Sequence, residues 1–207
     1  MEGEFVEMLT FNSDEKVLIL SDAHFGHAKL TRNCDQRFDQ YRNYDTTDEM
    51  ENDIITKWNR KVDENTIVIF LGDFMFGGPA SKTAERFRAF LKKMNKPKEF
   101  YFIMGNHDHL IRKKVEDIYM QNYLYFKYKG RNYLCQHFSF TDDQYGNPDV
   151  LNHLINIGAP VDVLVHGHTH SQQKYSDTMR DDGYVVQNNV SWEAWNDLVD
   201  VSELKDA

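Results

Sequence analysis

The chain has 207 residues, a formal net charge of −9 and 41% hydrophobic residues. This apolar content excludes a largely disordered chain, because disordered chains lack the apolar surface that offsets the entropy cost of folding, and we expect one domain over residues 1–207. The acidic total argues against tight, non-specific binding to nucleic acids, unless bound metal ions or a local basic surface reverse the field.

The two cysteines, Cys34 and Cys135, are too few for a disulfide framework, and we expect both to be reduced. The first residues lack a basic region followed by an apolar run, and no stretch approaches the roughly 18 apolar residues that span a bilayer. These features favour a cytoplasmic protein without a membrane partner. They do not indicate its oligomeric state.

In the first half of the chain, short apolar runs alternate with segments of helical periodicity. Strands are expected at 5–10, 16–20, 66–71 and 100–104, and a short helix follows Ala28. Longer helices are expected to begin at a cap at Thr46 or Thr47, to begin at Ser81, and to cover 110–119. The apolar face of the first long helix contains Met50, Ile54, Ile55 and Trp58. This alternation predicts βαβ units and a largely parallel sheet.

The second half of the chain is richer in strands. Residues 123–128 and 132–136 are expected to form a hairpin, and 161–165 another strand. Asn147-Pro148 is typical of a helix start, and that helix is expected to run to Gly158. Later alternating segments around 184–190 and 198–201 predict antiparallel strands.

Polar side chains follow most of these apolar runs directly. Ligands of parallel sheets bind beyond the carboxyl ends of the strands, so we expect the polar clusters to meet there. The candidate metal ligands are Asp22, His24, Asp73, Asn106, His137, His168 and His170. They provide two carboxylates, one amide oxygen and four imidazoles.

Mixed oxygen and nitrogen donors suit Mn, Fe, Zn or Ni better than Ca. Seven such donors exceed the needs of one tetrahedral zinc ion and match two ions that share a carboxylate. Two metal ions about 3.5–4 Å apart can clamp a phosphoryl group and lower the pKa of a bridging water. His107 is a candidate proton donor to the leaving oxygen, and Asp108 is expected to orient it.

Each cluster alone is weak evidence, because an isolated Asn-His-Asp after a strand is more often a capped turn. His-Gly-His-Thr-His is stronger, since three histidines around a glycine at a strand end rarely serve packing. Five clusters in order, each after an apolar run, favour a metal site over a purely structural explanation.

Taken together, the ordered clusters resemble the signature of the calcineurin-like metallophosphoesterases. The matching motifs are Asp22-x-His24, Gly72-Asp73, Gly105-Asn106-His107-Asp108, His137 and Gly167-His168-Thr169-His170. Their surroundings resemble small stand-alone bacterial and phage members. This resemblance implies a four-layer α/β/β/α sandwich, in which two mixed β-sheets are flanked by helices.

The resemblance also implies roles for individual residues. One metal ion would be held by Asp22, His24 and His170, and the other by Asn106, His137 and His168. Asp73 would bridge the two ions, and His107 would be the catalytic acid. Phe76 lies where many members have an acidic residue, and Phe138 is bulkier than the residue that usually follows the lone histidine, so the pocket is expected to differ in shape.

Three further residues have open interpretations. His27 is a candidate contact to the substrate phosphate, or a helix-start histidine that packs on Phe25. Arg37 is a second candidate phosphate contact, or a solvated loop arginine. His166 is expected to hydrogen-bond beside the site rather than to bind metal.

The resulting prediction is a hydrolase of a phosphomonoester or phosphodiester that uses two divalent ions, Mn most favoured, and a metal-bridging hydroxide. The expected partner is a small phosphoester, with nucleotides included. The first alternative is a nuclease or cyclic-nucleotide phosphodiesterase. The second, of a different class, is a non-catalytic scaffold of the same fold that binds another protein.

Overall fold

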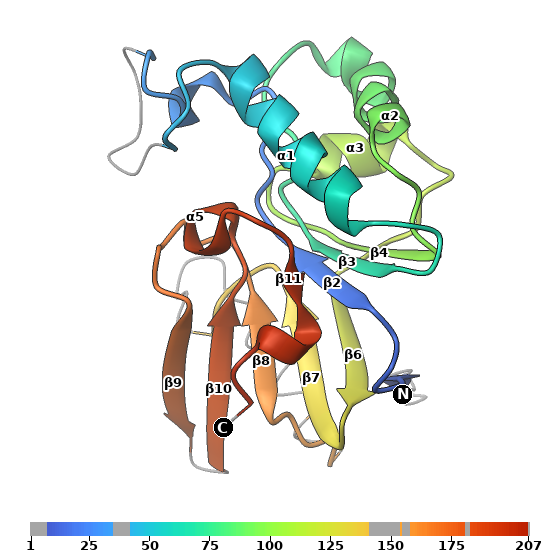
Figure 1. The fold of residues 1–207 in the computed structure, drawn as a ribbon, viewed down its shortest axis with the longest axis vertical. Coiled ribbons are helices and arrows are strands. Elements are labelled where there is room, and N and C mark those ends of the chain that lie inside the picture. The colour runs from blue at the N-terminus through green and yellow to red at the C-terminus, as the bar shows by residue number, and fades with distance from the viewer. Residues whose placement is uncertain (1–7, 35–41, 141–153, 155–157, 181–182, 207) are drawn as a thin grey trace.

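Two β-sheets lie face to face in the computed structural model of the chain (Figure 1). The structure describes residues 8–34, 42–140, 154, 158–180 and 183–206. The six-stranded sheet has the order β1-β6-β7-β8-β10-β9, and the five-stranded sheet has the order β11-β2-β3-β4-β5. The strands of the two sheets are β1 (Met8–Phe11), β2 (Val17–Leu20), β3 (Ile67–Leu71), β4 (Glu99–Ile103), β5 (Met120–Gln121), β6 (Tyr123–Tyr128), β7 (Arg131–Gln136), β8 (Val163–His166), β9 (Tyr175–Arg180), β10 (Gly183–Asn189) and β11 (Val199–Asp200).

The helices gather mainly on the outer face of the five-stranded sheet (Figure 1). The α-helices are α1 (Thr47–Lys61), α2 (Thr83–Lys93), α3 (His109–Lys114) and α5 (Trp192–Trp195), and short 3-10 helices cover Ala28–Leu30, Ala80–Lys82 and Val201–Glu203. Strands β2 to β5 run parallel to one another, as the strand–helix alternation predicts, and β11 pairs antiparallel with β2.

Successive side chains of the fully buried strands β2 and β3 enter different cores, because they point to opposite faces of the sheet. In β2, Leu18 and Leu20 pack under the helices, whereas Val17 and Ile19 pack between the two sheets. The continuous apolar run in this strand is therefore a consequence of burial on both faces. The predicted two mixed sheets flanked by helices are confirmed.

The predicted hairpin forms the centre of the six-stranded sheet. Strands β6 and β7 pair antiparallel, and β8 pairs parallel with both β7 and β10. The helix expected at 147–158 lies outside the described residues except for its positions 154 and 158. Leu154 is buried against Leu134 and Leu164 on the outer face of this sheet.

Local signals were correct at α1 and wrong at two other places. Thr46 caps α1, since its hydroxyl accepts the Glu49 N–H at 3.1 Å. Ser81 does not cap α2, because it lies inside the 3-10 helix Ala80–Lys82 and α2 begins after Lys82 without a side-chain cap. The third helix ends at Lys114, not near Tyr119, because Val115 is extended and the chain turns into β5.

Among the described residues, no helix combines the length and the apolar character that crossing a membrane requires.

Candidate metal centre

Loops at the carboxyl ends of five strands bring the predicted ligands together. Asp22 follows β2, Asp73 follows β3 and Asn106 follows β4, while His137 and His168 follow β7 and β8 of the other sheet. The loops bind one another directly: the Asp22 N–H donates to Gly72 at 3.0 Å, and the His168 N–H donates to the Asp22 carboxylate at 3.0 Å.

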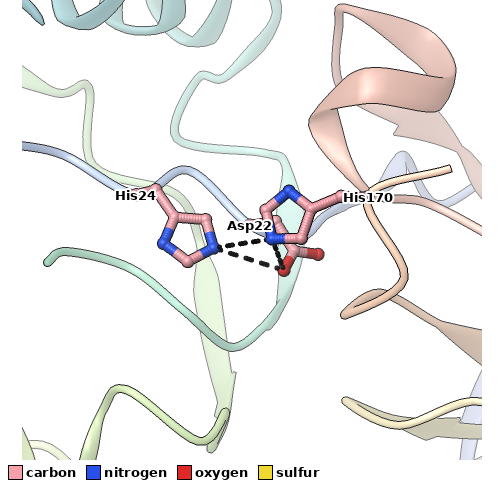
Figure 2. A group of neighbouring side chains, drawn as sticks. All are labelled: Asp22, His24 and His170. Atoms are coloured by element: carbon pink, nitrogen blue, oxygen red, sulfur yellow. Dashed lines mark hydrogen bonds and ion pairs between the residues drawn. The ribbon is translucent and has the colours of Figure 1, made fainter. Parts of the chain in front are cut away.

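The first donor group consists of Asp22, His24 and His170 (Figure 2). The Nε2 atoms of His24 and His170 lie 3.1 Å apart, and they lie 3.6 Å and 3.7 Å from Oδ1 of Asp22. Three donor atoms therefore converge on one point from two loops.

The second donor group consists of Asp73, His137 and His168. Asn106 joins it, because its Oδ1 atom lies 3.0 Å from Nε2 of His137 and 3.0 Å from Nδ1 of His168. The structure thus assembles all seven predicted ligands into two neighbouring groups.

Asp73 lies between the groups. Its Oδ2 atom is 3.5 Å from Nε2 of His24 and 3.4 Å from Nε2 of His137, so one oxygen faces ligands of both groups. Oδ1 of Asp22 is buried and has no hydrogen-bond partner. A buried carboxylate oxygen without a hydrogen bond is costly unless a cation satisfies it, so the site fits metal ions.

The backbone is strained at most of these ligands. Asp22, His24, Asp73, His168 and His170 all have positive φ angles, between 49° and 64°. Each such non-glycine residue costs of order 1–3 kcal/mol, and such strain clusters at functional sites. These loops therefore favour the direction of the ligand side chains over local backbone stability.

Charges within the site oppose the effect of burial. Burial alone raises the pKa of Asp22 and Asp73, but the adjacent histidines more than compensate and hold both carboxyl groups below their ordinary pKa. Burial works against protonation of His137, yet the Asp73 carboxylate raises its pKa to about 9. The two carboxylates thus stabilise positive charge here, whether a proton or a metal ion supplies it.

Gly105 is required for close approach rather than for a sharp turn. Its φ is not among the positive values, but a Cβ atom there would overlap the backbone and carboxylate of Asp73. Two loops that each carry a ligand are therefore in direct contact at this glycine.

Replacing Gly105 with alanine is expected to push the Asp73 and Asn106 loops apart. Overpacking of this kind typically costs about 1–3 kcal/mol, so the thermal unfolding midpoint should fall by several degrees and metal affinity should fall with it. The control is Ser81→Ala, which removes an exposed hydroxyl that caps nothing. Unchanged metal affinity in Gly105→Ala would contradict the close-contact explanation.

His107 stands beside the Asp73 carboxylate without joining either donor group. Its Nε2 atom lies 3.8 Å from Oδ2 of Asp73, its side chain is 34% exposed, and its ring packs edge-on against Phe76 at 4.7 Å. Burial is the main cause that lowers the pKa of His107. An accessible imidazole at the rim of the site is well placed to exchange a proton with a substrate.

The predicted role of Asp108 needs correction. The carboxylate is buried and accepts backbone N–H groups from Asp73 at 2.7 Å, Phe74 at 3.0 Å and Gly105 at 2.8 Å. Among the described residues it makes no hydrogen bond to the His107 ring. Burial, followed by the charge of Asp73, raises the pKa of Asp108 to about 7. Asp108 therefore ties two ligand loops together rather than orienting His107.

The other candidates have different outcomes. His27 is buried and packs on Phe76, with ring centroids 4.1 Å apart, rather than on Phe25. His166 is buried and its Nδ1 atom lies 2.9 Å from the Gly167 carbonyl oxygen, outside both donor groups, as expected. Arg37 lies outside the described residues. Phe138 packs edge-on against both His137 and His168, each at 4.9 Å.

Sequence reasoning missed two residues that support the first donor group. Oε1 of Glu193 lies 2.8 Å from Nδ1 of His170 and accepts the Nε–H of Arg42 at 2.8 Å. Arg42 also donates to the backbone carbonyls of Asp22 and Ala23. A carboxylate that holds the second nitrogen of a ligand histidine fixes its tautomer and orientation. In the sequence, Glu193 is an acidic residue between two tryptophans, and this unusual setting could have indicated a supporting role. Arg42 stands in a polar loop whose sequence gives no such indication.

Known proteins resemble this chain in sequence. A family model described as Calcineurin-like phosphoesterase matches residues 15–172. An uncharacterized protein of Methanocaldococcus jannaschii is 28% identical over 159 residues, which are 77% of this chain and 72% of that protein. The Gene 66 protein of Mycobacterium phage D29 is 27% identical over 207 residues, with coverage of 92% and 94%.

A solved structure supports the same fold. The crystal structure of a protein of unknown function from Aquifex aeolicus has a TM-score of 0.63 at 21% identity, covering 91% of this chain and 96% of that one. The family model extends over most of the chain and over every predicted ligand. The chain belongs to the calcineurin-like phosphoesterase family.

Proposed function

We propose that the protein hydrolyses a phosphoester with two divalent metal ions. The observation that carries the proposal is the position of Oδ2 of Asp73 between two donor groups, with His107 at 3.8 Å from the same oxygen. The mixed oxygen and nitrogen donors suit Mn, Fe, Zn or Ni, and of these Mn is proposed as the activating ion. When bound, two such ions neutralise charge on phosphoryl oxygens and lower the pKa of a water.

The protein side chains then divide the remaining work. The donor groups fix where the phosphoryl group binds, and His107 donates a proton to the leaving oxygen. A water oxygen bonds to phosphorus, the ester P–O bond breaks, and the products are an alcohol and a phosphate with one ester bond fewer. Phe76 and Phe138 border the site and limit the shape of the substrate.

Metal removal tests the proposal directly. Chelation is expected to lower turnover of bis(p-nitrophenyl) phosphate and p-nitrophenyl phosphate by about 10³-fold, since metal ions supply several kcal/mol of transition-state stabilisation. Addition of Mn should restore activity, and metal analysis should find two ions per chain. The ratio of the two activities would separate a diesterase from a monoesterase.

The same measurement separates the enzyme from a non-catalytic scaffold. A scaffold would show no metal-dependent turnover of either ester while it remained folded and bound metal. The position of His107 favours the enzyme, because its accessible ring lies beside the Asp73 carboxylate without joining either donor group, and a metal-binding scaffold does not need it.

A further inference from the structure

Positive charge is concentrated in one segment of this acidic chain. Residues 82–114 contain ten Lys and Arg residues and three Asp and Glu residues, whereas the whole chain has a net charge of −9. This segment includes α2 and α3, which pack side by side on the outer face of the five-stranded sheet (Figure 1). The total charge therefore hides a local basic surface.

The basic end of this surface begins at the metal centre. Helix α3 starts at His109, two residues after His107 and three after Asn106, and its last three residues are Arg112, Lys113 and Lys114. All three cations are exposed, and among the described residues none is in an ion pair with a carboxylate. At a rise of 1.5 Å per residue they lie within about 10 Å of the centre along the helix axis.

A cavity of about 310 Å³ lies where the candidate metal site meets α3, because its lining includes both Asn106 and His109, the first residue of that helix. Asn106 lines it, and so does Met104, whose sulfur lies 3.7 Å from Nη1 of Arg112. Phe138 contributes a second apolar wall, and the amide side chains of Asn122 and Gln136 contribute polar groups. The volume is at the lower end of the range for small-molecule sites, about 300–1,000 Å³, and the lining suits a flat ring with polar edges.

An exposed aromatic residue follows the cations in the sequence. Tyr119 follows α3 by five residues and is 81% exposed. Of the two intervening acids, Asp117 is paired with Arg88 at 2.6 Å, which leaves the exposed Glu116 against the three cations of α3. An exposed aromatic ring near basic side chains is a feature of surfaces that bind single-stranded nucleic acids, because bases stack on such rings.

We propose that the physiological substrate is a single-stranded nucleic acid. One nucleoside beside the scissile phosphate occupies the cavity at Asn106, and neighbouring phosphates bind Arg112, Lys113 and Lys114. The inference rests on the proposed phosphoesterase function and names its substrate class. A free cyclic nucleotide would fill the cavity but would leave the three cations unused.

The test compares a triple variant of α3 with a matched variant of α2. Arg112→Ala/Lys113→Ala/Lys114→Ala should lower kcat/KM for a fluorescently labelled single-stranded octanucleotide at least tenfold relative to that for bis(p-nitrophenyl) phosphate. Lys92→Ala/Lys93→Ala/Lys96→Ala removes the same charge away from the cavity and should leave this ratio unchanged. Equal losses in the two variants would overturn the proposal in favour of a general charge effect.

Binding gives a readout that does not depend on turnover. Both variants would carry His107→Ala, and binding of the octanucleotide would be measured by fluorescence anisotropy with Mn present. For single strands, the slope of log binding constant against log salt concentration is about −0.7 per phosphate contact. Loss of three contacts in the α3 variant should therefore make this slope shallower by about 2. An unchanged slope would overturn the proposal. If the protein hydrolysed the aryl ester but did not bind the octanucleotide, the substrate class would be rejected and the phosphoesterase function would be retained. If it hydrolysed neither the aryl ester nor the octanucleotide, the proposed function itself would be rejected.

Discussion

Replacing Asp73 with alanine is expected to abolish both metal binding and turnover, whereas replacing His107 with alanine should lower turnover alone. Asp73 faces ligands of both donor groups, so its loss removes a donor from each. His107 belongs to neither group and has a partly exposed ring. General acids contribute about 10²–10⁴-fold, and His107→Ala should lose an amount in this range while it keeps two metal ions per chain.

The choice of substrate sharpens this comparison. A p-nitrophenolate leaves readily without a proton, whereas an alkoxide needs one, so His107→Ala should harm alkyl phosphodiesters much more than aryl ones. Metal content by elemental analysis and turnover of both esters provide the measurement. Equal metal loss in the two variants, or equal harm to both esters, would contradict the assigned role of His107.

The second large effect is expected at Glu193, which contacts a ligand histidine rather than a metal ion. Glu193→Gln keeps the size of the side chain but removes the charge that His170 and Arg42 share. Loss of such a supporting carboxylate typically costs 10–100-fold in metal affinity. The affinity of the Asp22, His24 and His170 group should therefore fall about tenfold or more, and that of the other group should not change.

Isothermal calorimetry of metal binding would measure the affinity of each site. The loss of affinity should appear as a change from similar sites to one strong and one weak site. Glu64→Gln is the matched control, since Glu64 is exposed and lies in the turn before β3. The thermal unfolding midpoint of the variant should also be measured, because Arg42 is buried and loses its charged partner. Equal weakening of both metal sites would show that Glu193 supports the fold rather than one site.

Most of the architecture followed from local signals. Strands β2 and β3 were predicted by apolar runs, and the structure buries them on both faces. The Thr46 cap and the apolar face of α1 were correct because a cap and a periodic face depend on neighbouring residues alone. Strand β9 was not predicted, since its sequence, Tyr-Ser-Asp-Thr-Met-Arg, has no apolar alternation and it pairs only at the edge of the sheet.

The sequence by itself determined the chemistry of the centre, because the donor types and their positions at strand ends are written in the chain order. Tertiary structure decided which groups act on each other. Asp108 accepts hydrogen bonds from three backbone N–H groups of the ligand loops. Gly105 has no Cβ and so leaves space for Asp73, and Glu193 contacts His170, which is 23 residues away in the sequence. Such contacts depend on how the two sheets pack together, and no local sequence pattern specifies which distant residues that packing brings into contact.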